Sequence, residues 1–211
     1  MVGMYVPSHF AASDAEQARL LAELTAVDLV TAGPAGLQAS FLPMLYDAEA
    51  GSLVGHLARN NPHWQAAADP ACGESLAIVR GPDGYVSPSW YPSKAEHGRV
   101  VPTWNYLTAQ VFGRLVVHQD TEWLRALVTR LTERHEARRT DRVGNRWAVS
   151  DAPAAYLDGQ LRAIVGVELV ISRIEAKAKL SQNRPAADQA GVISGLGPDS
   201  PVAQLMRELS D

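Results

Sequence analysis

The chain has 211 residues and a formal net charge of −4, with 46% hydrophobic and 20% charged residues, which is ordinary for a globular protein. Its single cysteine, Cys72, excludes an internal disulfide and a cysteine-cluster metal site, and this favours a reducing, cytoplasmic setting. The sequence predicts no membrane-spanning helix and no signal peptide, and the negative charge disfavours a surface built mainly to hold nucleic acid.

The first part of the chain predicts one helix followed by three strands. Ser13-Asp14-Ala15-Glu16 has the pattern of a capping box, which begins a helix over about residues 13–25. Strands are predicted over residues 27–32, 37–46 and 52–57, separated by turn-forming residues. Such short connections are typical of an antiparallel meander.

The middle of the chain predicts a short helix and further strands. Asn61 is expected to cap this helix, with Pro62 as its first residue. A strand over residues 75–79 is expected to turn at Gly81-Pro82-Asp83-Gly84, and residues 87–101 are expected to form an ordered loop. Residues 104–117 then predict a strand in which Gly113 marks a bulge.

The last part predicts a long helix over residues 120–138, a short helix from Ser150, a long strand over residues 164–179 and a C-terminal helix over residues 202–209. With six or seven strands and no regular βαβ alternation, the expected fold is mainly β with peripheral helices (α+β). We expect a small antiparallel barrel that forms a single domain over residues 1–211.

The first candidate site lies where a predicted strand ends and the short helix begins. Arg59 and the backbone N–H groups at the helix start would suit a phosphate. Alternatively, Asn61 only caps the helix, Arg59 is a solvated cation and His56 is a strand residue. His56 and His63 have no third residue at clear ligand spacing, so we expect no metal site.

Aromatic side chains gather in a second candidate region. Trp90, Tyr91, Trp104 and Tyr106 are interleaved with prolines and hydroxyl groups, as in a rigid wall that stacks planar ligands or buries a partner subunit. Packing within the core is the alternative interpretation, and the spacing alone favours it.

The third candidate is the polar stretch Lys179-Leu180-Ser181-Gln182-Asn183-Arg184, which follows an apolar strand. Its cations and amides suit an anionic, planar ligand rich in heteroatoms. An exposed strand end is the alternative. We interpret Lys177 and Arg162 as solvated charges and Cys72 as an inert thiol.

Several short segments of the sequence together resemble one family. They are Met4-Tyr5-Val6-Pro7, Leu37-Gln38-Ala39-Ser40, Gly55-His56-Leu57-Ala58-Arg59-Asn60-Asn61-Pro62, Ser87-Pro88-Ser89-Trp90-Tyr91, Val101-Pro102-Thr103-Trp104-Asn105-Tyr106 and Lys179-Leu180-Ser181-Gln182-Asn183-Arg184. The chain is similar to the PaiB-like FMN-binding transcriptional regulators, a branch of the FMN-binding split-barrel group, over residues 4–196.

The resemblance implies a six-stranded split β-barrel that works as a homodimer with FMN at the subunit interface. It implies a phosphate site at Arg59 and Asn60, with Ser40 and His56 as neighbours. It also implies that the flavin ring is flanked by residues of the partner chain, for which the candidates are Trp104, Asn105, Lys179, Gln182 and Asn183.

The family name further implies negative regulation of transcription. The sequence itself shows no helix-turn-helix pattern and no basic stripe, so a DNA contact is unsupported by motif or charge. Two alternatives stay open: an FMN-dependent oxidoreductase acting on a small substrate, and a dimer whose flavin site is degenerate.

Overall fold

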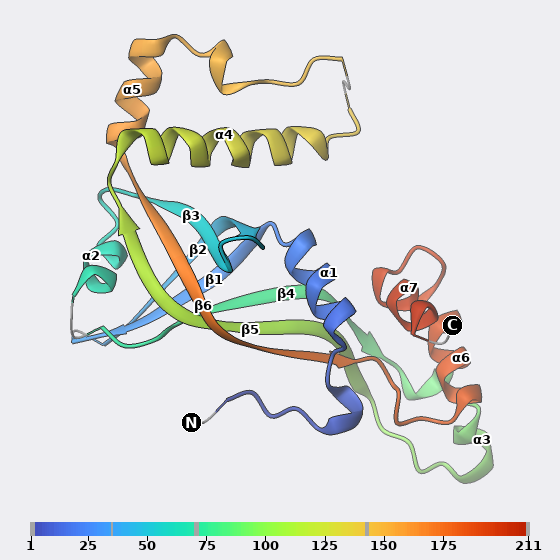
Figure 1. Ribbon diagram of the computed structural model, residues 1–211. Coiled ribbons are helices and arrows are strands. Elements are labelled where there is room, and N and C mark those ends of the chain that lie inside the picture. Colours follow the sequence, from blue (N-terminus) through green and yellow to red (C-terminus); the bar gives the residue numbers. More distant parts are fainter. Residues whose placement is uncertain (1–2, 35, 70–71, 142–143, 210–211) are drawn as a thin grey trace. The chain divides into compact units, whose positions relative to one another are not determined.

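The computed structural model describes residues 3–34, 36–69, 72–141 and 144–209 (Figure 1). Its strands are β1 (Ala26–Gly33), β2 (Gly36–Asp47), β3 (Ser52–Ala58), β4 (Ser75–Val86), β5 (Thr103–His118) and β6 (Ile164–Lys179). Its α-helices are α1 (Asp14–Glu23), α2 (His63–Ala68), α3 (Ser93–His97), α4 (Thr121–Ala137), α5 (Ala154–Arg162), α6 (Ala186–Leu196) and α7 (Pro201–Glu208). Short 3-10 helices are η1 (Ser8–Phe10), η2 (Pro88–Trp90) and η3 (Val149–Asp151).

The strands hydrogen-bond in the order β1-β2-β3-β6-β5-β4, which closes into a barrel. Strand β1 pairs antiparallel with β2 and β4, while β3 pairs antiparallel with β2 and β6. These pairings confirm the predicted meander and the mainly β, antiparallel fold class with peripheral helices.

The chain forms two compact units. Unit 1 comprises the described parts of Met1–Glu23, Val79–Gln110 and Glu175–Asp211, and unit 2 those of Leu24–Ile78 and Val111–Ile174. Strands β4, β5 and β6 each run from one unit into the other. The single-domain organisation stays a prediction.

In unit 2, helix α4 covers the outward side of β2 and β3 (Figure 1). Leu45 of β2 and Val54 of β3 are buried against Leu127 and Leu131, and Trp123 packs beside them. Burial of one such leucine contributes about 1.5–3 kcal/mol, so this apolar seam fixes α4 on the sheet. The long helix predicted over residues 120–138 is confirmed as α4, Thr121–Ala137.

In unit 1, the capping box at the start of α1 is confirmed. The Ser13 hydroxyl accepts the N–H of Glu16 at 3.3 Å, and the Glu16 carboxylate accepts the N–H of Ser13 at 2.6 Å. Helices α6 and α7 lie against each other near the C-terminus (Figure 1).

The turn predicted at residues 81–84 is wrong, because β4 continues without interruption from Ser75 to Val86. A Cβ at Gly81 would lie 2.9 Å from the carbonyl oxygen of Leu107. This glycine therefore provides room for a neighbouring backbone rather than a change of chain direction.

Two further helical regions differ from the predictions. The expected loop over residues 87–101 contains η2 and α3. Helix α6 was not predicted, and it contains Gly191 and Gly195, which are unfavourable inside a helix. Their role is close packing: an added Cβ at Gly195 would lie 2.3 Å from the Trp90 ring.

Candidate functional site

Arg59 follows the end of β3 in unit 2, and its own chain holds the guanidinium group in place. Its Nε donates to the carbonyl oxygen of Arg162 at 2.7 Å and its Nη2 to that of Ile164 at 3.0 Å. Its Nη1 donates to Oε1 of Gln119 at 2.9 Å. Since arginine carries five N–H donors, two remain to bind an anion at a fixed position. The neighbouring Asn60 side chain is exposed.

A partly buried polar network lies at the start of α2 in the same unit. The Ser40 hydroxyl accepts from Nδ2 of Asn61 at 3.1 Å and lies 2.9 Å from Nδ1 of His63. Asn61 Oδ1 accepts the backbone N–H of His63 at 3.0 Å, but the N-cap residue is Pro62, so the prediction that Asn61 caps this helix is wrong. The helix itself begins at His63, one residue later than predicted.

The phosphate interpretation of this helix start needs revision. Helix α2 has only six residues, and the N–H of His63 is already bound to Asn61. A phosphate at this end of β3 would therefore depend on the side chains of Arg59 and Asn60. Sequence reasoning missed Gln119, which directly follows β5 and whose amide oxygen accepts a hydrogen bond from Arg59. No local sequence signal could have joined two residues 60 positions apart.

His56 lies in a different environment from Ser40. It lines a cavity of about 350 Å³ with Pro43 of β2 and with Leu131 and His135 of α4. Within the described chain, Nδ1 of His56 and Nε2 of His135 are buried without a hydrogen-bond partner. Burial lowers the pKa of His56 below 6.5, so its imidazole is neutral at pH 7.

Burial also lowers the pKa of His63, whose side chain is 1% exposed. An unfolded histidine takes up a proton near pH 6.5, whereas folded His63 resists protonation until a lower pH. The free energy of unfolding should therefore fall as pH drops from above 6.5 toward the folded pKa. We expect His63→Gln to flatten this slope in urea titrations between about pH 7.5 and 5.

Exposed His97 provides the control for this prediction. His97→Gln should leave the dependence of the unfolding free energy on pH as in the unmodified protein. If the two variants show the same slope, His63 is not the group that links folding to protons.

In unit 1, Lys179 ends β6 and reaches across to the beginning of β5. Its Nζ donates to Oγ1 of Thr103 at 2.5 Å and to the carbonyl oxygen of Trp104 at 2.8 Å. Burial lowers the pKa of Lys179, and the charges of Lys177 and Arg184 lower it further. The three cations thus share one region of this unit.

Of the remaining predicted residues, Asn105 and Gln182 use their side-chain amides for hydrogen bonds within the chain. Asn105 is completely buried, and its Nδ2 donates to the Ser181 hydroxyl at 3.0 Å. Gln182 Nε2 donates to the Ala178 carbonyl at 2.6 Å, and its Oε1 accepts the N–H of Leu180 at 2.7 Å. Asn105 and Gln182 therefore shape the end of β6, where Ser181 adopts a left-handed φ of 68°. Asn183 is exposed.

The interpretation of Lys177 as a solvated charge is wrong. Its side chain is 9% exposed, and its Nζ donates to the carbonyl oxygen of Tyr5 at 3.0 Å. Sequence position alone gave no sign of this, because the covering residue comes from the far N-terminus.

The four clustered aromatics separate into two groups. Tyr91 is buried, and Trp90 contacts the glycines of α6. Trp104 remains 49% exposed, and its Nε1 donates to Asp83 Oδ1 at 2.9 Å. Core packing accounts for the first pair, while Trp104 and Tyr106 stay available for a ligand.

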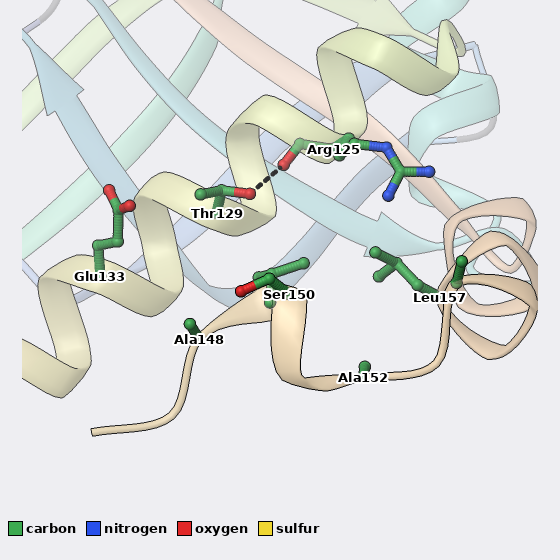
Figure 2. A pocket seen from close by; sticks show the side chains of 9 residues that line it. Arg125, Thr129, Glu133, Ala148, Ser150, Ala152 and Leu157 are labelled. Carbon is green, nitrogen blue, oxygen red and sulfur yellow. Dashed lines mark hydrogen bonds between the residues drawn. The ribbon is translucent and has the colours of Figure 1, made fainter. Parts of the chain in front are cut away.

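A groove in unit 2 separates α4 from the segment that contains η3 and the start of α5. Figure 2 shows Arg125, Thr129 and Glu133 along the helix and Ser150 and Leu157 on the opposite wall. Its volume is about 380 Å³, and none of the sequence-predicted site residues lines it. Arg125 Nη2 donates to Asp158 Oδ1 at 2.7 Å, so its charge is compensated within the chain.

Residues 3–34, 36–69, 72–141 and 144–209 contain no group of three or more His, Cys, Asp or Glu side chains placed to hold a metal ion. None of the helices formed by them combines the length and the apolar character needed to cross a membrane.

The donor groups present fit the chemistry of FMN. Its phosphate requires cationic and amide donors, such as the two remaining Arg59 N–H groups and the exposed Asn60 amide. A planar ring suits the exposed indole of Trp104, and Lys179 keeps one ammonium N–H for a polar atom.

Comparison with known proteins agrees with this chemistry. The chain is 31% identical to "Protease synthase and sporulation protein PAI 2" of Bacillus subtilis over 212 residues, which covers 99% of this chain and 97% of that protein. It is 32% identical over 205 residues to an uncharacterised protein of Emericella nidulans, covering 82% of each.

A solved structure supports the fold. A conserved hypothetical protein of Mycobacterium tuberculosis superposes with a TM-score of 0.56 at 16% identity, covering 86% of this chain and 94% of that one. Residues 4–173 match the family described as "Putative FMN-binding domain". The chain therefore belongs to this FMN-binding family, with an antiparallel split-barrel fold and FMN as its cofactor.

Proposed function

We propose that the chain works as an FMN-binding negative regulator of transcription and that it functions as a cytoplasmic homodimer. Arg59 and Asn60 of one protomer hold the phosphate, with Ser40 as a neighbour at the start of α2. His56, which lines the cavity beside α4, is not given a contact with the phosphate. The observation that carries the phosphate site is the anchoring of Arg59 by three acceptors, which leaves two N–H groups pre-positioned for an anion. The regulatory role is supported by the similarity to the sporulation protein PAI 2.

In this proposal the flavin ring lies against unit 1 of the partner protomer. Trp104, Lys179 and Asn183 contact the ring there, while Asn105 and Gln182 position the strand end behind them. Bound FMN supplies two-electron redox chemistry and visible absorption.

The part of the outward side of β2 that α4 leaves exposed supports a homodimer. Leu37 and Phe41 are 78% and 76% exposed, and Ala39 and Pro43 beside them are exposed as well. Successive alternate residues of a strand face the same side, so these four form one uncovered apolar stripe. Such stripes commonly mark a subunit interface.

Phe41→Glu is expected to weaken the homodimer by about tenfold or more, because a charge would be buried in an apolar interface. Light scattering over a dilution series measures the dimer dissociation constant. Tyr156→Glu changes a residue of unit 2 that is 62% exposed and lies outside the stripe, and it should leave this constant unchanged. If both variants raise the dimer dissociation constant to a similar extent, the stripe on β2 is not part of the dimer interface.

The net charge of the chain favours regulation through a protein–protein contact over regulation through direct binding to DNA. A net charge of −4 weakens non-specific attraction to DNA phosphates. We propose that flavin occupancy or redox state alters a surface that binds a regulatory partner. Pull-downs with FMN-loaded and FMN-free protein test this, since equal capture of the same partners in both states would contradict flavin control.

A second candidate is an FMN-dependent oxidoreductase that acts on a small substrate. The observation that favours it is the set of cations near Lys179, which would accept an anionic substrate beside the ring. Bleaching of the flavin absorbance by NADH or NADPH under anaerobic conditions separates the candidates. Rapid bleaching with multiple turnovers supports the enzyme, whereas a flavin that stays oxidised supports the regulator.

A further inference from the structure

The buried seam between α4 and the sheet of unit 2 leads into a cavity. In the seam, Val54 of β3 packs with Leu131 of α4. His56 lies two residues after Val54 on its strand, and His135 lies four residues after Leu131 on its helix, so each continues the same face of its element. Both histidines and Leu131 line a cavity of about 350 Å³, which we call the two-histidine cavity.

The two imidazole rings carry hydrogen-bonding atoms that have no partner. Within the described parts of the chain, Nδ1 of His56 and Nε2 of His135 are buried and make no hydrogen bond. A neutral imidazole has one N–H donor and one acceptor nitrogen, so each of these atoms either donates or accepts. Buried polar atoms are nearly always paired, and two unpaired atoms from residues that line one cavity therefore point to a partner from outside the chain.

The rest of the lining favours an uncharged, planar partner. Leu131 and the half-exposed Trp147 provide apolar surface, and the backbone N–H of Trp147 donates to Oε2 of Glu136 at 3.1 Å, which holds this residue beside α4. Of the residues that the structure describes, no lysine or arginine lines the cavity. Glu136, which lines it, keeps its negative charge while it pairs with Arg139 at 3.0 Å, and this charge disfavours an anion.

We infer that the two-histidine cavity binds a small neutral heteroaromatic molecule as a ligand distinct from FMN. Its ring packs against Leu131 and Trp147, and a donor and an acceptor on its edge pair with Nδ1 of His56 and Nε2 of His135. An apolar lining with a few polar atoms and a volume above about 300 Å³ is typical of small-molecule sites. The cavity is lined by none of the residues assigned to the flavin contacts, so the inference does not depend on the proposed function.

Titration of the full chain with three bicyclic molecules of nearly the same shape tests this inference. 7-Azaindole carries an N–H donor and an acceptor nitrogen on one edge, indole carries only the donor, and indene carries neither. We expect 7-azaindole to bind at least about tenfold more tightly than indene, with indole between them, because each missing hydrogen bond leaves a buried nitrogen unpaired.

Two outcomes of this titration would overturn the inference. Equal affinities for the three molecules, or no binding of any of them, would mean that water is the partner of the two nitrogens. Tighter binding of indole-2-carboxylate than of indole would show that the site prefers an anion rather than a neutral ring.

A matched pair of variants locates the ligand. His135→Phe keeps a ring but removes its nitrogens, so it should weaken 7-azaindole about tenfold and leave the affinity for indene nearly unchanged. His97→Phe makes the same substitution at an exposed histidine of unit 1 and should change neither affinity. Without ligand, His135→Phe should be at least as stable to urea as the unmodified protein, because an unpaired buried nitrogen is removed. Lower stability with an unchanged affinity for 7-azaindole would give His135 a purely structural role and contradict the inference.

Nitrogen-15 NMR of the unmodified protein provides a second readout that does not depend on how the variant folds. Saturating 7-azaindole should shift the resonances of both His56 Nδ1 and His135 Nε2, since a new hydrogen bond changes the electronic environment of each nitrogen. Bound 7-azaindole that leaves both resonances in place would show that it occupies another site.

Parallel titrations with FMN and at low protein concentration separate this site from the proposed function. Binding of 7-azaindole that persists at saturating FMN supports two separate sites, whereas competition between the two ligands would place the flavin in this cavity and refute the inference. Protein that binds 7-azaindole but not FMN would refute only the flavin-based function. Pro43 lines the cavity and also ends the exposed stripe on β2. If 7-azaindole binds only the diluted monomer, a second copy of the chain covers the cavity and the inference is wrong.

Discussion

Arg59→Ala is expected to weaken FMN binding about tenfold or more, while the affinity for riboflavin, which lacks the phosphate, changes little. The guanidinium is fixed by Gln119 and by two backbone carbonyl groups, so its remaining N–H groups meet the phosphate without a further loss of side-chain freedom. A hydrogen bond to a charged group contributes about 1.5–3 kcal/mol, which sets the tenfold scale.

Comparing FMN with riboflavin separates the loss of a phosphate contact from a general loss of protein stability in Arg59→Ala. Removing the Arg59 side chain also frees the three acceptors it joins, so the variant will be less stable, and both ligands report on that change equally. Arg162→Ala is the matched control, because its exposed side chain is removed while its backbone carbonyl, the acceptor of Arg59, is kept. If Arg59→Ala lowers the affinities for FMN and riboflavin equally, Arg59 does not bind the phosphate.

Gly113→Ala is expected to destabilise the protein strongly. A Cβ at this position would lie 2.1 Å from the carbonyl oxygen of Val170, a backbone atom of β6 that cannot move without disturbing the sheet. Overpacking of this kind costs about 3 kcal/mol. For a chain of this size we expect a Tm about 6–12 °C lower in thermal unfolding.

Gly73→Ala is the control, because no atom lies within 4 Å of an added Cβ there. Its Tm should match that of the unmodified protein. A Gly113→Ala protein with an unchanged Tm would mean that β5 and β6 do not approach as closely as described.

The same glycine illustrates what the sequence could and could not predict. Periodicity located β5 and β6 to within one residue at each end, since alternation along a strand is a local property. The role of Gly113 is not local: it depends on Val170, which is 57 positions away, and a bulge was the nearest local interpretation. Gly81 was misinterpreted for the same reason, because its role depends on the distant residue Leu107.

The candidate site divides in a similar way. Short-range features were predictable, including the start of the short helix to within one residue and the cluster of cations and amides at residues 179–184. The anchoring of Arg59 by Gln119 and the burial of Lys177 under Tyr5 join distant parts of the chain. Only the folded structure reveals such partners, and they decide which donors remain for a ligand.

FMN itself provides the most direct test of the central claim. We expect the purified protein, titrated with FMN, to give a shifted visible flavin spectrum and a rise in Tm at saturation, because a ligand that binds only the folded state stabilises it. Unchanged flavin absorbance together with an unchanged Tm at saturating FMN would contradict the account.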